Sequence, residues 1–363
     1  MPTIGMPKIQ IEFRSQGLSA IQRSERGIVL LLLKDDAKVK KENLEKCSLM
    51  YTNLADVKED AVSQENMKYI KLAFESAPNK LLVELYGTDR DLPTCLNDIK
   101  QVKFNYYCAP NASKEDTAKI LSWHKNRVKN DDKTIKFVAF NESADDETII
   151  NFTTSSVIYD DEKYSGLEFT SHIASALAAL PLSRSFTYYV FNKMSYATMD
   201  NAEDEDAAVN AGKLFITFDG EKYKIARGVN SLTTYVADKG EDFSKIRVME
   251  AMHLIKDDIR DTFDNYYVGK ILNDYQNKQQ FIAMINQVYF KELEGEILDS
   301  KGNSHVDIDM AQNRMYAVTR GADVDKMKEM DIKTYNTGSN VFLAGKVSLL
   351  DAMEDLKIIF KNA

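Results

Sequence analysis

Residues 27–33 read Gly-Ile-Val-Leu-Leu-Leu-Leu, and this stretch decides the fold expected for the N-terminal part of the chain. Its apolar run, Ile28 to Leu33, is too short to cross a bilayer and predicts a buried strand. Strands and helices then alternate at spacings that need crossover connections, which predicts an α/β domain with a mixed or parallel sheet. The elements expected next are the strand 81–86, helix 92–102, strand 103–108, helix 113–129, strands 134–140 and 148–153, and helix 167–179.

The C-terminal third has a different pattern. Asp219-Gly220 between two short apolar segments predicts a β-hairpin. One long helix is then predicted by apolar residues at spacings of three and four: Ile246, Met249, Met252, Ile255, Ile259 and Phe263. A second helix is expected over 278–293, and strands are expected where apolar residues alternate, at Val306, Ile308 and Met310 and at Val341 and Leu343. We therefore expect long helices on a small mixed sheet after a boundary near Asn230, and an α+β chain overall.

Both ends of the chain carry a short alternating segment, which predicts a half-buried strand at each extreme. The apolar positions are Ile9, Ile11 and Phe13 at one end and Leu356, Ile358 and Phe360 at the other. Chain termini fray unless something ties them down, so we predict that these arms add strands to neighbouring subunits. Glycines beside the arms have permissive backbones, and three of them are predicted hinge or linker positions: Gly17, Gly338 and Gly345.

Composition excludes several classes of protein. The net charge is −9 with no basic run, which argues against nucleic acid as a partner because phosphate binding needs concentrated Lys and Arg. The N-terminus has no signal-peptide pattern, and direct membrane insertion is not expected. Three widely spaced cysteines, Cys47, Cys95 and Cys108, fit a reducing cytoplasm.

Motifs for catalysis are missing from the sequence. It contains neither the dinucleotide-binding nor the P-loop glycine pattern, and no nucleophile elbow. The four histidines are isolated, and the best carboxylate groupings, Asp204-Glu205-Asp206 and Asp307-x-Asp309, fit a solvated turn and the polar face of a strand. We expect no enzyme activity, no cofactor and no metal.

Several segments resemble one known family. They are Arg227-Gly228-Val229-Asn230-Ser231-Leu232-Thr233, Ser244-Lys245-Ile246-Arg247-Val248, Tyr267-Val268-Gly269-Lys270 with Asn273, Asn336-Thr337-Gly338, Val341-Phe342-Leu343, and Asp351 to Leu356. Together they are similar to the contractile tail sheath proteins of myophages and of R-type, phage-tail-like bacteriocins, and the length resembles the small type from prophages of Gram-positive bacteria. The resemblance is strong from about Phe215 to the end of the chain.

This resemblance implies a domain plan and an assembly. Residues 1–22 are the N-terminal arm, 23–230 a variable domain facing outward, 231–354 a conserved assembly domain facing the tube, and 355–363 the C-terminal arm. Subunits are expected to form stacked hexameric rings around an inner tube, stitched by strand exchange, and to contract. The implied partners are other copies of the chain, the inner tail tube protein, and baseplate and tail terminator proteins.

The implied location is the tail sheath of a virion or phage-tail-like particle, assembled in the cytoplasm of a bacterial host. Two other interpretations stay open on the sequence. One is a cytoplasmic α/β nucleotide-binding enzyme with an oligomerisation domain. The other is a sheath from a related contractile system such as type VI secretion, although a single chain with both arms favours the phage or bacteriocin kind.

Overall fold

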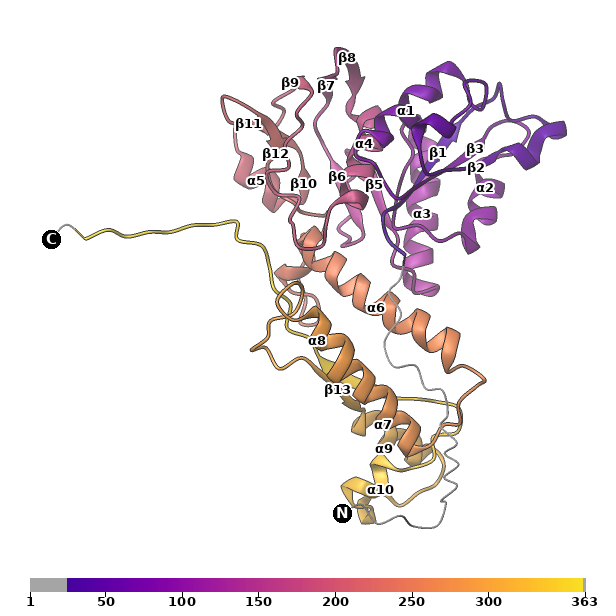
Figure 1. Ribbon diagram of the computed structural model, residues 1–363, viewed down its shortest axis with the longest axis vertical. Coiled ribbons are helices and arrows are strands. Elements are labelled where there is room, and N and C mark those ends of the chain that lie inside the picture. The colour runs from indigo at the N-terminus through magenta and orange to yellow at the C-terminus, as the bar shows by residue number, and fades with distance from the viewer. Residues whose placement is uncertain (1–24, 362–363) are drawn as a thin grey trace, which may run out of the picture. The chain divides into compact units, whose positions relative to one another are not determined.

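The computed structural model describes residues 25–361, and these form two compact units (Figure 1). The sheet unit comprises residues 25–257, 295–299 and 348–361, and the helical unit comprises 258–294 and 300–347. The division falls inside helix α6 (Ile246–Tyr266), not near residue 230. The reason is that side chains of the sheet unit hold the first half of α6. The assignment of 23–230 and 231–354 to variable and conserved assembly domains stays a prediction.

A seven-stranded sheet lies at the centre of the sheet unit, in the order β10-β6-β5-β4-β1-β3-β2. Its strands pair in parallel, except that β2 is antiparallel to β3. This confirms the α/β arrangement that the alternation predicts. The strands are β1 (Ile28–Lys34), β2 (Ser48–Tyr51), β3 (Lys80–Tyr86), β4 (Tyr106–Cys108), β5 (Lys136–Phe140), β6 (Ile149–Phe152) and β10 (Lys213–Leu214).

Strand β1 is apolar from Ile28 to Leu33 because both faces of the sheet are covered there. Val29, Leu31 and Leu33 enter a core with helices α1 (Gln64–Phe74) and α4 (Gly166–Ala179). Their neighbours Ile28, Leu30 and Leu32 enter a second core with helices α2 (Leu92–Asp98) and α3 (Lys114–Asn130). The sequence pattern predicted α2, α3 and α4 but missed α1.

Smaller elements complete the sheet unit. A three-stranded antiparallel sheet contains β8 (Glu162–Ser165), β7 (Ser156–Tyr159) and β9 (Met194–Ala197). The predicted hairpin is confirmed: β11 (Ile216–Phe218) and β12 (Tyr223–Ile225) flank Gly220, whose φ is 98°. Asp204 caps helix α5 (Glu205–Asn210), because its side chain accepts a hydrogen bond from the Ala207 N–H, so the acidic turn serves as a helix cap.

The helical unit holds the second half of α6 followed by α7 (Tyr275–Ala283), a π-helical segment (Met284–Tyr289) and α8 (Phe290–Leu293). These three segments correspond to the second predicted helix, 278–293. Helices α9 (Met310–Thr319) and α10 (Glu329–Lys333) and a two-stranded sheet of β13 (His305–Ile308) and β14 (Leu343–Lys346) complete the unit.

One strand prediction is wrong at its end. Met310 is the first residue of α9 rather than part of a strand, because the Asp309 side chain accepts a hydrogen bond from the Gln312 N–H at 2.9 Å and so caps that helix. Asp309 therefore lies at a helix start, not on the polar face of a strand. Val341 likewise lies just before β14.

Three further observations concern residues 25–361. No helix in this range combines the length and apolar character needed to span a membrane. The same residues form no group of three or more His, Cys, Asp or Glu side chains suited to a metal ion. Cys47, Cys95 and Cys108 are free and buried.

Candidate assembly site

The C-terminal arm has a root that is fixed to the sheet unit. Residues 348–350 run antiparallel to residues 297–299, with Leu349 opposite Leu298. The Asp299 N–H donates to the Ser348 carbonyl at 2.9 Å, and the Leu350 N–H donates to the Ile297 carbonyl at 2.8 Å. Backbone pairing therefore determines where the last segment of the chain leaves the unit.

Charged side chains extend this attachment to Asp355. Lys245 Nζ lies 2.5 Å from the Asp351 carboxylate. Arg227 donates to Glu354 at 3.1 Å and to Asp355 at 2.7 Å, and this second bond lowers the pKa of Asp355. The Ser185 hydroxyl donates to Glu354 at 2.6 Å. We call residues 348–355 the arm root, and it is thus held at both ends: through residues 348–351 at one end and through Glu354 and Asp355 at the other.

The arm root joins segments that the sequence analysis singled out separately. Arg227 comes from the stretch after the β11–β12 hairpin, Lys245 and Arg247 from the start of α6, and Asp351 to Asp355 from the end of the chain. The sequence marked all three for their family resemblance, yet it gave no sign that they touch.

Beyond Asp355 the arm has no regular secondary structure in the described residues, and Figure 1 shows it as an extended trace at the yellow end of the chain. The apolar side chains predicted to serve as strand contacts are exposed: Leu356 at 85%, Ile358 at 58% and Phe360 at 88%. A row of exposed apolar side chains is typical of an interaction surface.

The other predicted site residues are placed as follows. Ile9, Ile11, Phe13 and Gly17 lie outside the described residues. Gly338 has a φ of 63° in the loop before β14, a conformation that favours glycine. Gly345 lies inside β14 rather than in a linker, and a Cβ there would stand 2.3 Å from the His305 carbonyl oxygen.

A second group of residues from the segments that carry the family resemblance lies together in the helical unit. The Asn273 side-chain amide donates to the Gly338 carbonyl at 2.7 Å and to the Asn340 carbonyl at 2.9 Å. Beside it lies a cavity of about 400 Å³ with a mainly apolar lining that includes Phe263, Tyr267 and Val341. Asn273 thus fixes the loop that leads into β14.

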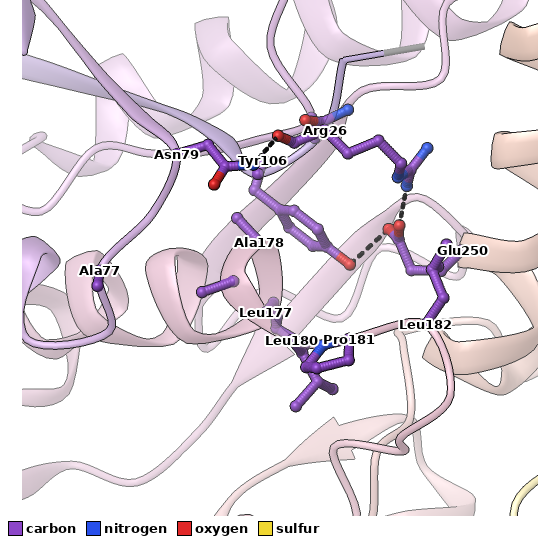
Figure 2. Close-up of a pocket in the computed structure, with 13 residues that line it drawn as sticks. Arg26, Ala77, Asn79, Tyr106, Leu177, Ala178, Leu180, Pro181, Leu182 and Glu250 are labelled. Carbon is purple, nitrogen blue, oxygen red and sulfur yellow. Dashed lines mark hydrogen bonds and ion pairs between the residues drawn. The ribbon is translucent and has the colours of Figure 1, made fainter. Parts of the chain in front are cut away.

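A buried ionic cluster in the sheet unit was not predicted from the sequence; Figure 2 shows three of its residues, Arg26, Tyr106 and Glu250, beside a cavity of about 260 Å³. The Glu250 carboxylate on α6 accepts a hydrogen bond from Tyr106 Oη at 2.6 Å and pairs with the Arg26 guanidinium and with Lys136 Nζ. One signal was available. Glu250 follows Ile246 by four residues, so it places a charge on the apolar face of a helix.

The carboxylate at the centre of this cluster is fully paired. Burial alone raises the pKa of Glu250, but Lys136 and Arg26 outweigh burial and hold that pKa well below its ordinary range. Both carboxylate oxygens already have partners, one with Arg26 and the other with Tyr106 and Lys136. A carboxylate in this state accepts no proton near neutral pH, so the cluster has the chemistry of a structural attachment.

Comparisons with known proteins show the family of this chain, and the matched region covers the arm root. Residues 238–358 match the family described as the phage tail sheath C-terminal domain. The chain is 37% identical, over 98% of its own length and 98% of the relative's, to the tail sheath protein of Clostridium phage phiCD119. The chain belongs to the tail sheath protein family. The matched range of this sheath protein includes the start of α6 and the whole arm root.

Solved structures agree with this family in fold. The sheath tail protein of Desulfitobacterium hafniense is 17% identical with a TM-score of 0.63, over 83% of this chain and 93% of that one. The helical sheath of the anti-feeding prophage in its contracted state is 10% identical with a TM-score of 0.69, over 99% of each chain. The predicted family and fold class of the sheath protein are therefore confirmed, and it is a structural subunit of a phage-type tail.

Proposed function

We propose that this sheath protein polymerises as stacked hexameric rings around an inner tube by exchanging terminal strands, and contracts to drive that tube through a cell envelope. The observation that carries the proposal is the C-terminal arm: its root is fixed, while its apolar face is exposed beyond Asp355. An arm of this kind donates a strand to another molecule. We further propose the tube protein, baseplate and tail terminator as partners, and assembly in the host cytoplasm.

The helical unit offers an edge that can accept such a strand. The Asp309 N–H donates to the Phe342 carbonyl at 3.0 Å, which sets the phase of the β13–β14 ladder. In an antiparallel ladder alternate residues point their backbone groups to the same side, so Leu343 and Gly345 direct theirs away from β13. Within residues 25–361, β13 is the sole strand that pairs with β14.

The opposite edge of this small sheet is already occupied. Val306 N–H donates to the Asn286 side-chain oxygen at 2.8 Å, and the Asn286 amide returns a bond of 2.8 Å to the Val306 carbonyl. A side chain thus takes the place of a neighbouring strand along β13. This asymmetry favours β14 as the acceptor of an arm from another copy.

The expected free energy of docking one arm is consistent with reversible strand exchange. Burial of an apolar side chain contributes about 1.5–3 kcal/mol, and three such residues face one side of the arm. Ordering the backbone costs roughly 1–2 kcal/mol per residue, which offsets much of that gain. One arm therefore holds modestly, and a lattice in which every subunit gives and receives arms gains from high effective concentration.

Relatives support the contractile part of the proposal. The anti-feeding prophage protein forms a helical sheath with a contracted state, and its fold covers nearly all of this chain. A contracting sheath needs two packings of the same subunits related by rigid-body movement. Fixed arm roots with extended arms allow strand pairing to persist through such a movement.

Truncation tests the proposal. Full-length protein, a variant without residues 355–363 and a variant without residues 1–15 are compared by negative-stain electron microscopy and by thermal unfolding. The full-length protein is expected to form tubes of regular diameter, and each truncated protein to remain a folded monomer. Regular tubes from both truncated proteins would contradict strand exchange.

A further inference from the structure

The first turns of α6 carry a buried arginine and a largely buried glutamate, and these reach toward opposite ends of the chain. Arg247 is 6% exposed, and the Glu250 side chain is 12% exposed. They are three residues apart, about 4.5 Å along the helix axis, on a segment that belongs wholly to the sheet unit. Both residues bind other segments of the sheet unit, so their shared position at the start of α6 needs an explanation.

Arg247 holds the C-terminal arm root through backbone atoms. Its Nη1 donates to the Leu350 carbonyl at 2.5 Å and its Nη2 to the Glu296 carbonyl at 3.0 Å. One guanidinium therefore joins the two antiparallel segments that form the root. A planar fork of donors suits this task, whereas a lysine ammonium in the same place cannot span both carbonyls with the same geometry.

Glu250 holds the beginning of the described chain. Its carboxylate pairs with Arg26, whose backbone carbonyl accepts a hydrogen bond from the Asn79 side chain at 2.7 Å (Figure 2). Tyr106 and Lys136 complete the carboxylate's surroundings from β4 and β5. Arg26 comes four residues after the predicted end of the N-terminal arm, at residue 22.

We infer that the start of α6 is a common anchor for the roots of both arms, with Arg247 and Glu250 as its positioning residues. This inference rests on the proposed exchange of arms. A helix transmits displacement as a rigid element, so a pull on one arm shifts the attachment of the other. In a sheath, a displacement of one neighbour would then be transmitted through the start of α6 to the neighbour bound by the other arm.

Hydrogen exchange of the dilute, unpolymerised full-length protein tests the coupling. Two variants are compared with the wild type, and each makes only a small change to the side chain. Arg247→Lys keeps the charge but loses the fork, and Tyr106→Phe removes one bond to Glu250. Each variant is expected to speed exchange about tenfold at the root it does not touch, as well as at its own, since a charge-assisted hydrogen bond is lost. For Arg247→Lys the decisive measurement is the exchange rate at residues 26–34, and for Tyr106→Phe it is the exchange rate at residues 348–355.

Lys256→Met is the matched control, because Lys256 also lies on α6 but its ion pair is with Asp132, which belongs to neither root. It is expected to leave exchange at residues 26–34 and 348–355 unchanged. If each variant speeds exchange at its own root alone, the roots are independent and the inference is wrong. Tube formation by the arm-truncated proteins is a separate result, which contradicts the proposed strand exchange but leaves the anchor intact.

Discussion

Arg227 and Glu354 are 127 residues apart in the chain, and the Nε of Arg227 donates to the Glu354 carboxylate at 3.1 Å. The same guanidinium reaches Asp355, so a single arginine marks the last point at which the chain is held. Everything beyond that point is exposed up to Lys361. The pair therefore separates the part of the chain that folds with the subunit from the part available to a neighbour.

Replacing Arg227 by Gln is expected to loosen the end of the arm root with little loss of global stability. Partly exposed ion pairs contribute about 0–1 kcal/mol, so the melting temperature changes little. Hydrogen exchange at residues 351–355 is expected to rise. Lys224→Gln, which removes a separate ion pair with Asp219, is the control and leaves that exchange unchanged. Unaltered protection in Arg227→Gln would show that the backbone pairing of the root suffices.

Phe360→Asp is expected to abolish tube formation while the monomer melts as before, because Phe360 is already exposed in the single chain. The alternating pattern puts Leu356, Ile358 and Phe360 on one face of the arm and Ile359 on the other. Ile359→Asp is the matched control, with a smaller effect on assembly measured by sedimentation. Equal effects at Phe360 and Ile359 would argue against a strand with one buried face.

Gly345→Ala is expected to destabilise the β13–β14 sheet by about 1–3 kcal/mol, since the added Cβ would stand 2.3 Å from the His305 carbonyl oxygen. Gly240→Ala is the control, because its φ is −79° and no atom lies within 4 Å of the added carbon. Chemical denaturation measures both changes. A neutral effect of Gly345→Ala would show that the β13–β14 sheet accommodates the added carbon without loss.

Acid is expected to destabilise the sheet unit through His124, which is fully buried with its Nε2 at 2.8 Å from the Thr148 hydroxyl. Burial lowers the pKa of His124 to about 3. The folded protein thus binds a proton less readily than the unfolded chain, whose histidine has a pKa of about 6.5. The stability is complete above that pH and falls, by up to a few kcal/mol, as the pH drops toward about 3.

His124→Gln should flatten this pH dependence relative to the wild-type protein when the free energy of unfolding is measured from pH 7 to pH 4. His305→Gln is the control, because His305 is exposed at the start of β13. If the wild type and His124→Gln lose stability in parallel, another group is responsible for the acid sensitivity.

Local sequence patterns predicted much of the fold and the apolar face of the C-terminal arm. The continuous apolar run at residues 28–33, the period of two in residues 356–360 and the period of three to four in α6 all depend on the order of side chains along a short segment. Capping reversed one such prediction, because Asp309 starts a helix where the alternation suggested a strand. Helix α1 was missed, and the sequence did not show that Glu250 binds the first half of α6 to the sheet unit.

By itself, the sequence determined the alternation of strands and helices, the apolar face of the C-terminal arm and the family to which the chain belongs. Only the tertiary structure decided that Arg26 meets Glu250, 224 residues away, and that Arg247 reaches the Leu350 carbonyl. Hydrophobic periodicity is set by neighbours in the chain, so it can be read locally. Partners of buried charges are set by which segments the fold brings together, because an ion is stable inside a protein only where an opposite charge or a backbone dipole meets it.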